Sequence, residues 1–66
     1  MQERKFTLMQ WRKIAGLSRN ELAEAVNKDP TTIWNWETGK TNPNATDIAN
    51  LEHVLNINWS QDILMP

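Results

Sequence analysis

The sequence lacks cysteine altogether and has one histidine and two glycines among its 66 residues. Without cysteine, the chain has neither a disulfide framework nor a thiolate site. It also has no long apolar run and no signal-like segment, so we expect a cytoplasmic protein with no membrane partner. A chain of this length buries only about 60% of the surface that its unfolded form exposes, which predicts a single domain over residues 1–66.

The groups that catalysis or metal binding would need are equally scarce. His53 has no second ligand or nucleophile at useful spacing, and Ser18 has no base beside it. The two glycines lie too far apart to form a loop that cradles phosphate. The sequence therefore predicts no enzyme, no cofactor, no metal site and no small-molecule substrate.

Start and stop signals predict five short helices and no strand. Residues 1–6 are polar and uncapped, which predicts a flexible arm. Thr7 and Gln10 form a capping box for a first helix that stops at Gly16. The apolar residues that this helix turns inward are Leu8, Trp11 and Ala15.

Two further helices joined by a tight turn are predicted between residues 18 and 39. Ser18 and Glu21 form a capping box, so the earlier of the two starts at Arg19. In the turn, Asn27 tolerates a left-handed backbone, Asp29 is a helix cap, and Pro30 suits the first position of the next helix. The apolar stripe of the earlier helix consists of Leu22, Ala23 and Val26.

The later helix of this pair runs to about Glu37 and ends through residues 38 and 39. With a period of 3.6 residues, its inward side holds Ile33, Trp36 and Glu37. Its opposite side carries a polar face that a core does not require, formed by Pro30, Thr31, Trp34, Asn35 and Thr38. This outward side is the candidate functional surface.

A fourth and a fifth helix complete the pattern. Asn44 and Asp47 form a capping box that starts the fourth helix after Pro43. The apolar stripe of this helix consists of Ala45, Ile48, Leu51 and Leu55. Asn58 with Gln61 caps a last short helix that ends near Leu64.

These residues resemble the helix-turn-helix repressors of the phage repressor and Cro type, also called the xenobiotic-response-element family. The matching positions run from Arg12 to Leu55 and are residues 16–18, 21–23, 32–33, 36–37, 39–40, 43 and 51, besides those two. The family usually has Gly where this chain has Asn27, and Gln where it has Arg19. The resemblance implies a compact, five-helix domain of the lambda-repressor type that binds double-stranded operator DNA in a bacterial host.

The chemistry of the outward face fits base reading. The Asn35 amide suits adenine, and Thr31 offers a hydroxyl and a methyl group for thymine. By resemblance, the base-contacting positions fall on Pro30, Thr31 and Asn35, although Pro30 leaves only apolar contact. Trp34 has two readings of equal weight, contact with DNA or packing against the preceding helix.

Contacts with the DNA backbone are expected around this face. Arg19 at the start of its helix is a natural phosphate clamp, whereas a surface charge such as Lys40 is more often merely solvated. The expected backbone-contacting residues are Arg19, Lys28, Thr38, Lys40, Thr41 and Asn42. The formal net charge of −1 argues against DNA binding, since neutralisation of phosphates supplies most non-specific affinity, so a DNA binder of this charge should lean on base and shape readout more than on bulk attraction.

Arg12 and Glu37 are each a lone charge on an otherwise apolar helix face, and pairing them is the economical explanation. Proteins that this chain resembles have such an ion pair between the first helix and the end of the recognition helix, which here is the helix predicted from Pro30 to about Glu37. We therefore expect a structural pair that fixes the angle of that helix.

The brevity of the chain resembles Cro-type phage repressors, and we expect a homodimer on a near-palindromic operator. Ile57 and Trp59 are the candidate interface, because residues 57–66 have more apolar material than a minimal core needs; for Trp59, core packing is the alternative. A rival reading keeps the fold but makes it a protein-interaction module, antitoxin-like or bound by an anti-repressor.

Overall fold

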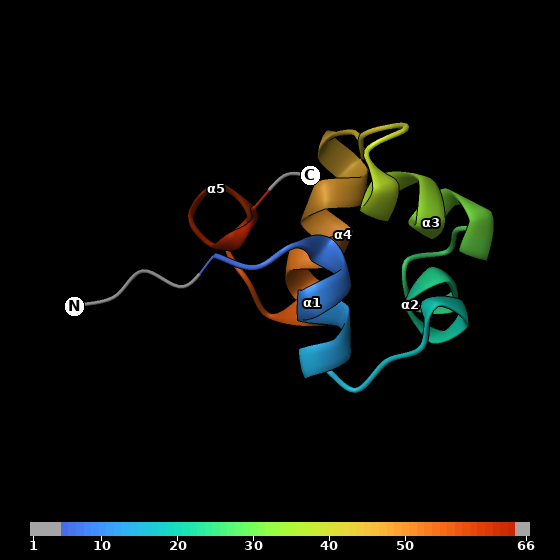
Figure 1. Ribbon diagram of the computed structural model, residues 1–66, viewed down its shortest axis with the longest axis horizontal. Coiled ribbons are helices and arrows are strands. Elements are labelled where there is room, and N and C mark those ends of the chain that lie inside the picture. Colours follow the sequence, from blue (N-terminus) through green and yellow to red (C-terminus); the bar gives the residue numbers. More distant parts are fainter. Residues whose placement is uncertain (1–4, 65–66) are drawn as a thin grey trace.

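The computed structural model describes residues 5–64 as a small all-helical domain (Figure 1). The predicted five-helix, all-α fold is confirmed. The helices are α1 (Leu8–Ile14), α2 (Arg19–Ala25), α3 (Pro30–Thr38), α4 (Ala45–Leu55) and α5 (Trp59–Asp62). Within residues 5–64, no helix is long and apolar enough to cross a bilayer.

Local capping explains why three of the helices start where they do. Thr7, Ser18 and Asn44 each accept a hydrogen bond from the backbone N–H three residues later, and the side chain at that later position accepts from the cap backbone. The predicted starts at these three positions are confirmed. Asp29 and Asn58 also occupy N-cap positions but make no side-chain capping bond, so the caps predicted there are wrong in that detail.

The core lies between the helix-turn-helix pair and α4. The three most deeply buried large side chains are Leu22 of α2, Ile33 of α3 and Leu51 of α4. Helix α3 packs against α2 and α1. Two predicted core positions are wrong: Ala15 is exposed because α1 has already ended there, and Ala45 is exposed at the first position of α4.

The two ends of the described chain are fastened together. Phe6 forms an isolated parallel β-bridge with Ile63. The Phe6 ring packs edge-on against the Trp11 ring, with the two ring centres 5.1 Å apart. The Trp11 indole N–H donates to the carbonyl oxygen of Asp62 at 2.8 Å. The arm predicted over residues 1–6 is therefore wrong for Phe6, which joins the fold, while residues 1–4 lie outside the described part.

The capping box of α2 predicts a specific pH dependence. The Ser18 backbone N–H donates to the Glu21 carboxylate at 2.7 Å, and this bond together with the Ser18 hydroxyl lowers the pKa of Glu21 below its ordinary value of 4.5. A lowered pKa means that the carboxylate stabilises the fold above its ordinary pKa, and that this stabilisation disappears as the pH falls through the lowered value.

We therefore expect Glu21→Gln to melt at a lower temperature than the natural sequence at neutral pH. The difference in Tm between the two proteins should shrink as the pH falls below 4.5. Thermal melts followed by circular dichroism across this range measure it, and a difference that stayed constant would contradict the role of the charged cap.

Candidate nucleic-acid interface

The turn before α3 sets the direction of the candidate recognition helix. Asn27 adopts a left-handed backbone with φ 58°, in the position where the resembled family usually has Gly. The Lys28 N–H then closes the turn by donating to the Ala23 carbonyl at 2.8 Å. Pro30 occupies the first turn of α3, where its missing N–H is not needed. At the other end, Gly39 ends the helix with φ 80°.

The predicted division of α3 into two sides agrees with its burial. Ile33 and Trp36 are buried, and the Glu37 side chain is almost inaccessible. On the outward side, Asn35 is half-buried and the other members are exposed, namely Pro30, Thr31, Trp34 and Thr38. We call these five residues the outward face of α3.

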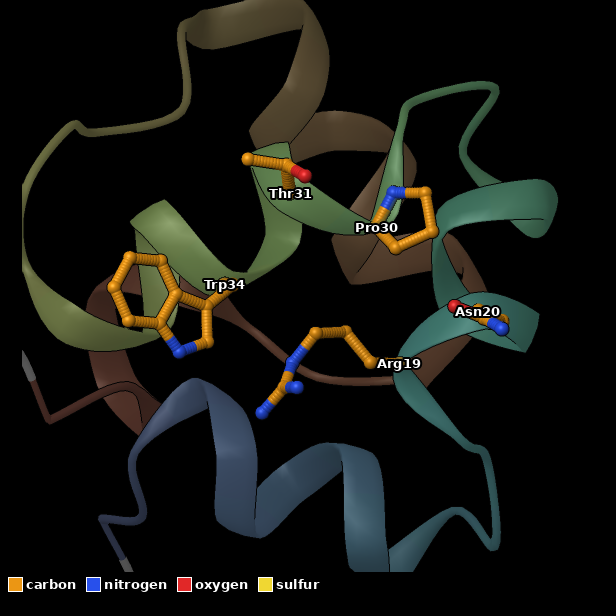
Figure 2. A pocket seen from close by; sticks show the side chains of 5 residues that line it. All are labelled: Arg19, Asn20, Pro30, Thr31 and Trp34. Atoms are coloured by element: carbon orange, nitrogen blue, oxygen red, sulfur yellow. The ribbon is translucent and has the colours of Figure 1, made fainter.

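A surface groove of about 350 Å³ lies between the start of α2 and the outward face of α3. Figure 2 shows Arg19 and Asn20 reaching it from α2, and Pro30, Thr31 and Trp34 from α3. Sequence reasoning missed Asn20 as a site residue. Its place on the polar side of α2, away from the stripe containing Leu22, was the signal that could have found it.

Trp34 belongs to the surface and not to the core. Its side chain lies at the groove, 40% of the residue is exposed, and the Lys40 ammonium sits 4.9 Å from the centre of its ring. A cation over an indole face is attracted by the ring quadrupole. The loop after α3 thereby places a positive charge beside the outward face, which the spacing of the two residues in sequence did not reveal.

The predicted Arg12–Glu37 ion pair is present, and a second arginine, Arg19, also pairs with Glu37. Arg12 Nε lies 2.7 Å from Glu37 Oε2, and Arg12 Nη1 also donates to the Leu17 carbonyl at 3.0 Å. Arg19 Nε lies 3.1 Å from Glu37 Oε1. One carboxylate on α3 therefore holds arginines from both α1 and α2.

The other residues that were expected to contact the DNA backbone lie in different surroundings. Lys28 Nζ lies 3.3 Å from Asp47 Oδ1, so this lysine links the turn to the start of α4. The Thr38 hydroxyl donates to the Trp34 carbonyl at 2.9 Å, within its own helix. Thr41 and Asn42 are exposed in the loop between α3 and α4.

Neither of the two candidate dimer residues lines the groove. Ile57 and Trp59 are both half-buried and pack against the hydrophobic core. The backbone N–H of Trp59 donates to Glu52 Oε2 at 2.8 Å, which fixes the start of α5. Both positions therefore serve the fold, and they leave only part of each side chain for a second copy.

Residues 5–64 hold no cluster of three or more His, Asp or Glu side chains that could bind a metal ion. A family model described as helix-turn-helix matches residues 8–61, from the first residue of α1 into α5. Comparison with curated proteins and with solved structures finds no significant match.

Proposed function

Because the chain belongs to the helix-turn-helix family of the Cro/C1 type, whose members are DNA-binding regulators of transcription, we propose that it is a Cro-type repressor of a phage or prophage. In this proposal it binds a near-palindromic operator as a homodimer, in the cytoplasm of a bacterial host. It acts by occupying the operator and excluding the transcription machinery, with no catalytic step.

The observation that carries the proposal is the outward face of α3 with the groove beside it. Four of its five residues are exposed on a helix whose opposite side is buried. A protein surface that only needed solubility would not require this mixture of amide, hydroxyl and indole groups, whereas a helix inserted in a major groove uses such groups for hydrogen bonds and methyl contacts.

Selection of bound duplexes from a random pool tests this proposal directly. We expect the selected sequences to share a near-palindromic motif. A family of bound sequences with no shared motif would contradict a sequence-specific repressor.

Base reading by Asn35 is tested on the selected duplex. Asn35→Ala should cost about 1–3 kcal/mol of binding free energy there and leave binding to random DNA almost unchanged, because a base contact carries sequence information. Thr31→Ala should act in the same direction with a smaller effect. Fluorescence anisotropy with both duplexes measures this, and equal losses on the two would withdraw the base-reading role.

The exposed indole of Trp34 favours a second candidate function, docking of a protein partner on the same face. The two functions differ in their response to salt. A DNA binder loses affinity steeply with ionic strength as counterions are released, with a slope that reports the number of neutralised phosphates. A wild-type chain with no measurable, salt-dependent binding to duplex DNA would favour the protein partner.

A further inference from the structure

We propose that Glu37 positions the guanidinium of Arg19 for a DNA phosphate. This inference rests on the proposed function and deepens it, since it assigns a DNA-directed role to a buried carboxylate that does not itself meet DNA. Glu37 is thus a positioning residue, and Arg19 is the group that makes the contact.

The charges in the cluster leave a surplus beside the groove. The Glu37 side chain is 3% exposed and carries one negative charge, and it accepts from two cationic side chains. Arg12 is buried, and it also uses Nη1 for the Leu17 carbonyl. The Arg19 side chain is 38% exposed, so the positive charge that remains unbalanced lies at the surface, on Arg19.

The geometry of the arginine fork leaves its outer end available. Arg19 meets Glu37 through Nε at 3.1 Å, and within residues 5–64 no hydrogen bond involves its two terminal amino groups. A guanidinium has five donors in a fixed plane, so a bond through Nε orients Nη1 and Nη2 without consuming them. These two groups can then form the bidentate contact that phosphate oxygens favour.

The position of Arg19 puts this fork beside the DNA-reading surface. Its side chain lines the groove with Thr31 and Trp34 (Figure 2). A flexible arginine would lose side-chain freedom on binding, whereas one already held by Glu37 has lost part of it in the free protein. Glu37 should therefore strengthen DNA binding by holding Arg19 in place. If the carboxylate acted only through its own charge, it would instead repel the phosphates and weaken binding.

The test measures the affinity of a mixed-sequence duplex over a series of KCl concentrations, with far-UV circular dichroism to verify folding. Arg19→Gln should weaken binding and reduce the salt slope by about 0.9, the value for one phosphate contact. Glu37→Gln should weaken binding despite removing a negative charge. In the Arg19→Gln background, the effect of Glu37→Gln should shrink by about threefold or more.

Glu24→Gln supplies the matched control, because it removes the same carboxylate charge from an exposed position of α2 outside the Glu37 cluster. Its effect should add to that of Arg19→Gln. Should Glu37→Gln fail to fold, Arg19→Lys carries the test: it keeps the charge and the salt slope but lacks the fork, so it should bind more weakly than the natural sequence.

Three outcomes would overturn the inference: an unchanged salt slope in Arg19→Gln, additive effects of Arg19→Gln and Glu37→Gln, or wild-type affinity in Arg19→Lys. In each of these the natural sequence still binds DNA, so the proposed function stands. Absence of DNA binding by the natural sequence would overturn both.

Discussion

Glu37→Lys is expected to leave the domain largely unfolded at room temperature. The substitution removes the carboxylate that accepts from Arg12 and Arg19 and places a third cation between them. Breaking a buried ion pair by removal of one partner costs about 3–5 kcal/mol, and a reversed charge adds repulsion. A chain of this size has roughly 3–10 kcal/mol of total stability. Loss of the helical far-UV circular dichroism signal measures the effect.

The matched control is Glu24→Lys, which makes the same change of charge at an exposed position of α2. It should alter stability little, because exposed charges contribute little. A double-mutant cycle with Arg12→Met and Glu37→Gln then isolates the pair, and its free energies of unfolding should be non-additive. A coupling of zero would contradict the ion pair as a stabilising contact.

The sequence predicted helix starts well because capping is local. Thr7, Ser18 and Asn44 each pair with a residue only three positions later, so both partners are visible in one short window. The bridge between Phe6 and Ile63 could not be predicted in this way. Its partners lie at opposite ends of the described chain, and only the packing of α5 beside α1 brings them together.

The cluster around Glu37 shows the same division. Arg12 and Glu37 were predictable as partners because each is a lone charge on an apolar stripe, where an unpaired charge would be costly. Arg19 gave no such signal, since it does not interrupt the apolar stripe of its helix. Its contact with Glu37 arises from how α2 packs on α3, which periodicity within one helix does not encode.

The outward face of α3 was predictable from helical period alone, because burial follows the inward stripe. Its role in base reading stays a prediction, which the Asn35→Ala measurement addresses. The polar side of α2 marks Asn20 as facing solvent, but its place at the groove and the Lys40 contact on Trp34 each depend on how two segments meet in space.

Disruption of the contact between the two subunits is expected to weaken operator binding by about 100-fold or more. One recognition helix reads only about half of a specific site, and half-sites of such operators lie one DNA turn apart, roughly 34–36 Å centre to centre. Linking two weak contacts makes the second one intramolecular, which is where most of the gain in affinity arises. The chain should therefore be a weak dimer or a monomer in free solution and dimerise on the operator.

The choice of variant for this test follows from burial. Ile57→Asp, although Ile57 is a candidate interface residue, would place a charge against the core and destabilise the fold. Leu64 belongs to the same apolar segment and is 50% exposed, and its bond to the Phe6 carbonyl comes from the backbone N–H, so Leu64→Asp tests the surface without breaking that bond. Ile14→Asp, at a residue that is 60% exposed at the end of α1, is the control for adding a negative charge at an exposed apolar position.

Sedimentation of the protein with a selected duplex that contains two half-sites measures the stoichiometry. We expect two chains per duplex for the natural sequence and for Ile14→Asp, with cooperative binding. Leu64→Asp should fill the two half-sites independently and only at higher concentration, because each subunit then binds without its neighbour. A natural sequence that saturated at one chain per duplex would contradict the dimer, and the apolar segment from Ile57 to Leu64 would then serve the fold alone, through the core contacts that Ile57, Trp59 and Ile63 already make.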